Sequence, residues 1–189
     1  MVLTLDVGNT NINLGLFDGD TICMRARFAT QRDNTDDQFA VLLHTLVTMH
    51  GIDPAAIQGG IISSVVPELT AELENAVYIL TGKKPLCLVP GVKTGLNILI
   101  DNPAQLGADL AAGAVGAVVR YPLPAFVIDL GTATKIYAVD EHKSFRGCTI
   151  APGVRVSLKA LTKVSSLLPA IPLEPPKKTC GTNSVESMQ

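Results

Sequence analysis

Short apolar runs, each closed by turn-forming residues, open the chain and predict three strands joined by turns. Asp18-Gly19-Asp20 is a hairpin signal between the second and third runs. Thr35-Asp36-Asp37-Gln38 is a capping-box pattern that begins a helix, and apolar residues at helical spacing continue this helix to Gly51. The chain therefore begins with a β-meander followed by a helix. The expected strands span residues 2–6, 12–17 and 21–28.

The next part of the chain alternates short apolar runs with longer helical patterns. Pro67 opens one helix, which stops near Gly82, and Asn102-Pro103 starts another, which runs to about Arg120. The expected strands here span residues 61–66, 86–89 and 96–100.

After Arg120 the opening pattern begins again. When Asp6 is aligned with Asp129 without gaps, Gly8 falls on Gly131, and each copy reads as strand, polar turn, strand, turn and strand. We expect two duplicated half-domains, 1–120 and 121–189, although two unrelated meanders would also give this pattern. The expected strands of the second copy span residues 126–129, 135–139 and 144–150, with a hinge at 120–124.

Composition and charge narrow the possible partners and location. Of the 189 residues, 47% are hydrophobic and 17% charged, which is typical of a globular protein, and the net charge is −2. No basic tract favours nucleic acid or a membrane surface. The apolar run 110–119 is shorter than the roughly 20 residues that cross a bilayer, and no signal peptide precedes the first strand. The four cysteines form no CxxC pair, so we expect free thiols in a reducing cytoplasm.

The repeated turn has the composition of a site for phosphate and metal. Asp6 ends a strand, where a carboxylate can hold hydrated Mg²⁺, and Gly8 lets another group approach the backbone. Asn9, Thr10 and Asn11 add donors that suit an anion, although an Asp-Gly turn is often only a turn. Two such turns that face each other would grip a polyphosphate from both sides, as in actin-like ATPases and sugar kinases.

Asp109 is a candidate functional carboxylate. It is the one acidic residue between Pro103 and Arg120, on a helix that is otherwise rich in Ala, Gly, Leu and Val. A solvated helix residue is the alternative. Because apolar residues lie on almost every side of this helix, we expect Asp109 to line a cavity.

The sequence closely resembles the type III pantothenate kinases along nearly its whole length. The resemblance implies an α/β fold of duplicated actin-like (ribonuclease H-like) half-domains, with mixed sheets and flanking helices. The matching segments are Asp6-Val7-Gly8-Asn9-Thr10-Asn11, Ser63-Ser64-Val65-Val66-Pro67, Asp101-Asn102-Pro103, Gly107-Ala108-Asp109, Asp129-Leu130-Gly131-Thr132-Ala133-Thr134, Ile150-Ala151-Pro152-Gly153, Leu168-Pro169 and 181–189.

The resemblance implies transfer of the ATP γ-phosphoryl group to pantothenate, the first step of coenzyme A synthesis. Asp109 would be the base, Asp6 would bind Mg²⁺, and Asp129 would bind a monovalent cation, K⁺ or NH₄⁺. Family members are dimers with sites at the interface, where residues 181–184 would reach the other chain's pantothenate. The implied ATP and phosphate ligands are Asp6, Gly8, Asn9, Thr10, Asn11, Asn13, Gly131 and Thr132. The implied pantothenate contacts are Ile100, Gly107, Ala108, Asp109, Leu110 and Ser184.

The chain departs from the family pattern at five places. Leu110 replaces an arginine, which removes a fork of donors from the expected acid-binding pocket and would cost about 1.5–3 kcal/mol. Ile100 replaces a tyrosine, Lys135 a threonine, and Arg146 the first of two glycines. Lys135 or Arg146 would return positive charge nearby. Ser165-Ser166 replaces Thr-Ala, which keeps a hydroxyl.

These departures leave three functions open. The first is an active pantothenate kinase. The second is a catalytically impaired, kinase-like paralogue that binds nucleotide or pantothenate as a regulatory protein, and the third is a kinase for another small acid or alcohol. The family also continues beyond the point that matches Gln189, so we expect the second half-domain to be incomplete, or the chain to be a fragment.

Overall fold

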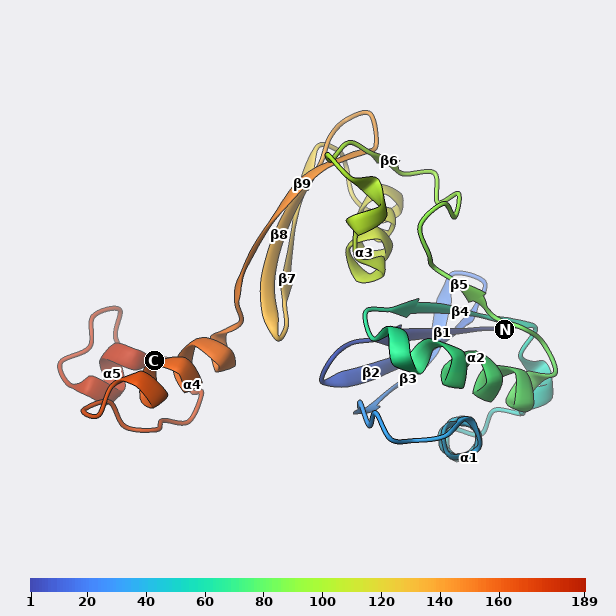
Figure 1. Ribbon diagram of the computed structural model, residues 1–189, viewed down its shortest axis with the longest axis horizontal. Coiled ribbons are helices and arrows are strands. Elements are labelled where there is room, and N and C mark those ends of the chain that lie inside the picture. The colour runs from blue at the N-terminus through green and yellow to red at the C-terminus, as the bar shows by residue number, and fades with distance from the viewer.

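The computed structural model describes residues 1–189 and contains two mixed sheets, which lie at an angle to each other (Figure 1). The first sheet has five strands in the order β3-β2-β1-β4-β5. β1 pairs with β2 in antiparallel and with β4 in parallel orientation, so the first strand lies in the middle of its sheet. Its strands are β1 (Val2–Val7), β2 (Asn11–Asp18), β3 (Thr21–Ala29), β4 (Gly59–Ser64) and β5 (Leu86–Cys87).

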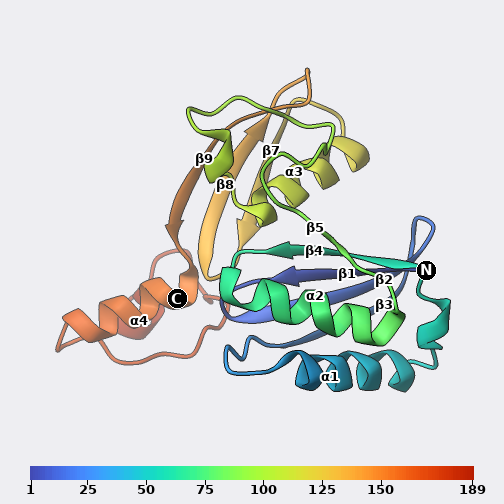
Figure 2. The ribbon, with the colours of Figure 1, turned by 45° about the vertical axis from the view of Figure 1, so that its right-hand side comes forward.

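Helices α1 (Asp36–Met49) and α2 (Pro67–Thr81) cover one face of this sheet (Figure 2). The predicted capping box at Thr35 is confirmed, because its side chain accepts from the Gln38 amide and the Gln38 side chain accepts from the Thr35 amide. Alternate residues of β1 point toward the helices and are fully buried there with Phe39 and Leu43. A short 3₁₀ turn, η1 (Pro54–Ala56), leads into β4. This core contains 18 buried apolar residues.

The second sheet has four strands in the order β6-β9-β8-β7, and α3 (Ala108–Arg120) packs on one of its faces (Figure 2). Its core is small: Leu110 and Ala114 of the helix meet Tyr137, Val139 and Phe145 of the sheet. The strands are β6 (Asn97–Ile98), β7 (Ala125–Leu130), β8 (Ala133–Val139) and β9 (Ser144–Pro152).

The predicted fold class is confirmed, but the change of sheet does not fall where the repeat begins. The chain leaves the first sheet at β5 and joins the second at β6, which pairs with β9. Both β6 and α3 therefore pack with the second sheet, although we predicted a boundary at residue 120. The strand repeat marks the start of the second meander, whereas the side chains that α3 buries decide which sheet it joins.

The two meanders share one connectivity, as the repeat predicts, but the gapless alignment is wrong beyond the turn. β1-β2-β3 and β7-β8-β9 are both antiparallel. Asp6 is opposite Asn13, whereas Asp129 is opposite Lys135, so the second turn is one residue shorter. Lys135 is therefore the structural counterpart of Asn13.

Two helices differ from the sequence prediction. The helix expected from Asn102 is interrupted: η2 (Pro103–Gln105) is a single 3₁₀ turn, and α3 begins after Gly107 in extended conformation. Helix α4 (Val154–Val164) was not predicted, although its apolar residues recur at helical spacing. Helix α5 (Ser184–Met188) follows its N-cap Asn183, whose side chain accepts a hydrogen bond from the Glu186 amide. No helix has the combination of length and hydrophobicity that crossing a bilayer requires.

One face of the second sheet has no cover within the chain. Phe126, Ile128 and Leu130 of β7 point away from α3 and are 80%, 61% and 73% exposed. The outer edge of β7 is also unpaired, whereas the corresponding edge of β1 pairs with β4. The structure therefore contains the second meander and lacks a counterpart of β4 beside it.

We predict that Gly113→Ala destabilises the protein, because a Cβ there overlaps the hydroxyl oxygen of Tyr137. Tyr137 is buried and stacks on Phe145, so it has little room to move. Overpacking of this kind costs about 1–3 kcal/mol. The control is Gly116→Ala, where a Cβ meets open space and should stabilise the helix by about 0.5–1 kcal/mol. Thermal unfolding followed by circular dichroism tests both, and equal effects of the two substitutions would contradict the packing argument.

Candidate active site

The first turn of α3 places Asp109 at the junction of the two sheets. Asn102 caps η2 by accepting a hydrogen bond from the Ala104 amide, and the extended Gly107 then starts α3. Asp109 Oδ1 accepts from the Leu110 amide at 2.8 Å, and a helix N-terminus favours a carboxylate. A Cβ on Gly107 would lie only 2.6 Å from this same oxygen, so a larger residue there would displace the Asp109 carboxylate.

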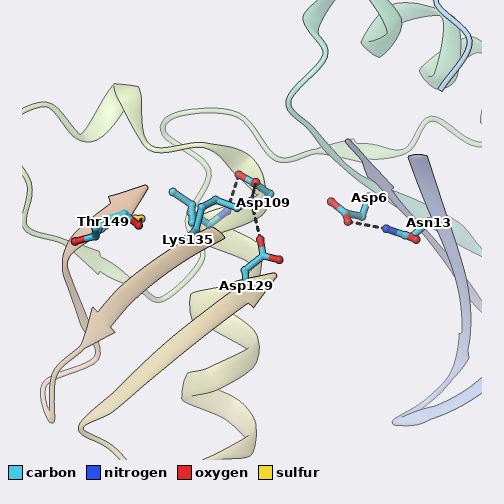
Figure 3. Close-up of polar contacts among 8 residues, drawn as sticks. Asp6, Asn13, Asp109, Asp129, Lys135 and Thr149 are labelled. Carbon is cyan, nitrogen blue, oxygen red and sulfur yellow. Dashed lines mark hydrogen bonds and ion pairs between the residues drawn. The ribbon is translucent and has the colours of Figure 1, made fainter. Parts of the chain in front are cut away.

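Lys135 joins Asp109 to Asp129 (Figure 3). Its Nζ lies 2.5 Å from Asp109 Oδ2 and 2.6 Å from Asp129 Oδ2, and its side chain is 16% exposed. Burial alone would lower the pKa of Lys135, but its bonds to the two carboxylates outweigh burial and raise the pKa above its usual range. The stabilisation from this raised pKa is fully present below the unfolded value, about 10.4, and is lost only as pH rises through the higher folded value. The ammonium is therefore charged at neutral pH.

Asp6 brings a third carboxylate to the same place from the first sheet (Figure 3). Its Oδ2 accepts a hydrogen bond from Asn13 Nδ2 at 3.2 Å. Partial burial raises the pKa of Asp6, the Asn13 amide opposes this shift, and the charges of Asp109 and Asp129 add to it. The pKa of Asp6 is therefore affected by the charges of acidic residues on α3 and the second sheet.

The two polar turns meet each other. The hydroxyls of Thr10 and Thr132, which are counterparts in the two meanders, lie 3.0 Å apart. Within the first turn the Gly8 amide donates to Asn11 O, and in the second the Gly131 amide donates to Ala133 O. The expectation that these turns face each other therefore agrees with the structure.

Neighbouring residues that sequence reasoning did not assign support both turns. Arg32 donates to Asn9 Oδ1 at 2.9 Å and forms an ion pair with Glu68. The Gly153 amide donates to Thr132 O, and a Cβ on Gly153 would come within 2.6 Å of that oxygen. Nothing in the spacing of Arg32 marks it, whereas Gly153 lies in a motif that carried the family resemblance.

A cavity of about 540 Å³ lies beside the start of α3. It extends between the β4–α2 junction, the loop 88–94 and the first residues of α3. Gly107 and Ala108, two of the expected pantothenate contacts, line it, whereas Asp109, which we expected to line a cavity, is not among its lining residues. The cavity walls are largely apolar, and they include Ser64, Val65, Pro67, Leu88, Val92 and Leu106.

Leu110, Ile100 and Ser184 lie elsewhere. Leu110 is only 8% exposed and belongs to the core of the second sheet, and Ile100 packs against the same core. The expected contact of these two residues with a substrate is therefore not what the structure shows. The side chain of Leu110 leaves the helix in a different direction from Asp109 because successive residues are about 100° apart. Ser184 begins α5, which lies beside α4 and away from α3 (Figure 1).

The hydroxyl of Ser63, which is opposite Asp6 in the β1–β4 register, is buried without a hydrogen-bond partner. No group of three His, Cys, Asp or Glu side chains is arranged to hold a metal ion unaided.

All four cysteines are free, as expected, and Cys87 donates to Glu74. Burial, together with Glu74, raises the pKa of Cys87 to about 12.

Comparison with known proteins gives a consistent result. The profile of the type III pantothenate kinase family matches residues 2–189. A type III pantothenate kinase of Halalkalibacterium halodurans is 42% identical over the whole chain, which spans 74% of that relative, and one of Geobacillus sp. (strain WCH70) is 41% identical, with 73% spanned.

Solved structures share the fold at much lower identity. A Baf family protein from Campylobacter jejuni has a TM-score of 0.60 at 19% identity, covering 98% of this chain and 71% of its own. A protein described as a 2-dehydro-3-deoxygalactonokinase, from Sinorhizobium meliloti, has a TM-score of 0.51 at 12% identity. The match covers 88% of this chain and 58% of that protein. These likenesses support the sugar-kinase type of fold.

We predict that Leu110→Arg destabilises the protein, because it places a guanidinium in the core beside Tyr137 and Phe145. An unpaired buried charge costs about 3–5 kcal/mol. The control is Leu110→Met, which conserves volume and should cost less than about 1.5 kcal/mol. Chemical denaturation measures both changes. A fully stable arginine variant would show that this side chain reaches solvent or a ligand.

Proposed function

Because this chain belongs to the type III pantothenate kinase family, we propose that it transfers the γ-phosphoryl group of ATP to the primary hydroxyl of pantothenate. The observation that carries the proposal is the meeting of Asp109, Asp6 and the two polar turns next to a mainly apolar cavity. Phosphoryl transfer depends mostly on positioning and charge neutralisation, and this arrangement supplies both.

We assign the ATP phosphates to the two turns. Gly8, Asn9, Thr10 and Asn11 carry the donors of the first turn, and Gly131-Thr132 carries those of the second. The contact between Thr10 and Thr132 supports this assignment, since it brings both sets of donors to one place. Backbone and side-chain donors in such turns suit an anion.

Asp6 fits a role as a Mg²⁺ ligand, and Asn13 would hold its carboxylate in place. Mg²⁺ commonly takes one or two carboxylates together with substrate phosphates and water, so a cluster of three acidic ligands is not needed. When bound, the ion would neutralise phosphate charge. The residues around Asp129 do not fit a free monovalent cation, because the Lys135 ammonium already contacts its carboxylate.

Asp109 is the proposed base. It accepts one hydrogen bond at each oxygen, from Lys135 and from the Leu110 amide, and a carboxylate oxygen has lone pairs to accept more. Gly107 and Ala108 line the cavity, so a substrate there would lie beside the start of α3. The apolar walls suit the hydrocarbon part of pantothenate, whose hydroxyl would then point toward Asp109.

We predict that Asp109→Asn lowers the catalytic rate by about 10²–10⁴-fold, because an amide cannot accept the proton. ATP binding should remain nearly unchanged, since the phosphate turns are intact. A coupled assay of ADP release with and without pantothenate, together with calorimetric ATP titration, measures these effects. Asp20→Asn, at an exposed hairpin, is the matched control and should behave like the wild type.

Wild-type activity that does not respond to Asp109→Asn would remove Asp109 from this role. ADP release that does not depend on pantothenate would favour a different acceptor. No release with any small acid or alcohol would favour the non-catalytic paralogue. Leu110, the departure that most favours that paralogue, lies in the core of the second sheet.

We further propose a cytoplasmic homodimer that uses the outer side of α3. Ala112 and Val119 are exposed on this helix, and Val119 is 76% exposed. Helix α5, which Ser184 begins, lies away from α3 (Figure 1), and this position is compatible with a contact to the partner's substrate.

We predict that Val119→Asp gives the monomer mass in light scattering at micromolar concentration, because a carboxylate would be desolvated in an apolar interface. Val41→Asp on α1 is the control, since Val41 is also exposed, at 68%, and should leave the dimer intact. A monomeric wild type, or the same mass for the wild type and both variants, would contradict this interface.

A further inference from the structure

The three carboxylates of Asp6, Asp109 and Asp129 gather where negatively charged phosphates are proposed to bind. Like charges in close proximity disfavour one another unless a cation lies among them. Mg²⁺ bound at Asp6 would compensate the charge of the phosphates and of the one carboxylate that the first sheet supplies. The pair formed by Asp109 and Asp129 needs positive charge of its own.

The chain supplies this charge from within. Lys135 extends from β8 directly opposite Asp129, and its ammonium touches one oxygen of each carboxylate, at 2.5 and 2.6 Å. The side chains of Lys135 and Asp109 are only 16% and 23% exposed, so water does not easily separate these two groups, whereas that of Asp129 is 44% exposed. Asn13, its counterpart in the first meander, contacts Asp6 in the same way but brings no charge.

We propose that the Lys135 ammonium is a tethered monovalent cation, which takes the place expected for a free K⁺ or NH₄⁺ at Asp129 and also contacts Asp109. Lys135 is then a positioning residue that acts through Asp109. This inference rests on the proposed function. A free cation directed at the same oxygens would be repelled by the ammonium already bound there. The protein should therefore work without the added salt that a free-cation site requires.

Two substitutions distinguish a lysine that replaces a bound cation from a lysine that only stabilises the fold. Lys135→Thr shortens the side chain, leaves an oxygen and opens room between the two carboxylates. Lys135→Met removes the charge but fills a similar volume, so no ion can enter. If Lys135 only stabilises the fold, potassium should not distinguish these variants. If it replaces a cation, potassium should rescue the threonine variant alone.

The test measures pantothenate-dependent ADP release in KCl, in NH₄Cl and in tetramethylammonium chloride, at equal ionic strength. We expect the wild-type rate to be the same in all three salts. The threonine variant should be slower by about ten- to a hundredfold in tetramethylammonium chloride and recover in KCl or NH₄Cl. The methionine variant should remain slow in every salt.

Melting temperature in the same three salts gives a second readout that needs no activity. KCl should raise it, relative to tetramethylammonium chloride, for the threonine variant only. A potassium-specific rise for the wild type, or no such rise for the threonine variant, would overturn the proposal. So would a wild-type rate that depends on K⁺. A wild type without turnover would contradict the proposed function. The melting temperatures would still show whether Lys135 occupies the site of a cation.

Discussion

The packing of α3 between the two sheets is the constraint on which the site depends. The helix contacts β7 and β8 of the second sheet and β4 of the first. Its Gly113 allows Tyr137 to come close, and Ala114 is fully buried in the same contact. Small residues along this face bring β8 near enough for Lys135 to reach the first turn of the helix. Larger side chains would move Asp109 away from its partners.

Charge balance follows from this geometry. A kinase that binds ATP must hold several negative groups near its own acidic residues, and each needs a compensating partner in a partly desolvated place. Asp109 and Asp129 share a lysine, and Asp6 has only an amide. The least compensated carboxylate is therefore the one assigned to Mg²⁺. The three carboxylates therefore differ in how far their charge is compensated, and this difference agrees with the roles proposed for them.

The strands and the position of Asp6 were predictable because polar residues stop an apolar run abruptly, which marks a strand end. Thr35 and Gly82 likewise mark helix ends through local chemistry, and both appear as helix caps in the structure. The orientation of Leu110 and the partner of Lys135 were not predictable in this way. They depend on which sheet α3 joins, and this is decided by contacts between residues far apart in the sequence.

The two cores differ greatly in size, with 18 buried residues in the first and five in the second. Local stability follows buried apolar contacts, so the second sheet and α3 form the weaker cooperative unit. Amide hydrogens there should exchange through partial openings that leave α1 and α2 folded. Asp109, Asp129 and Lys135 all belong to this weaker unit. Heat would therefore inactivate the protein while α1 and α2 remain folded, and a ligand that joins both sheets would protect it by linking their unfolding.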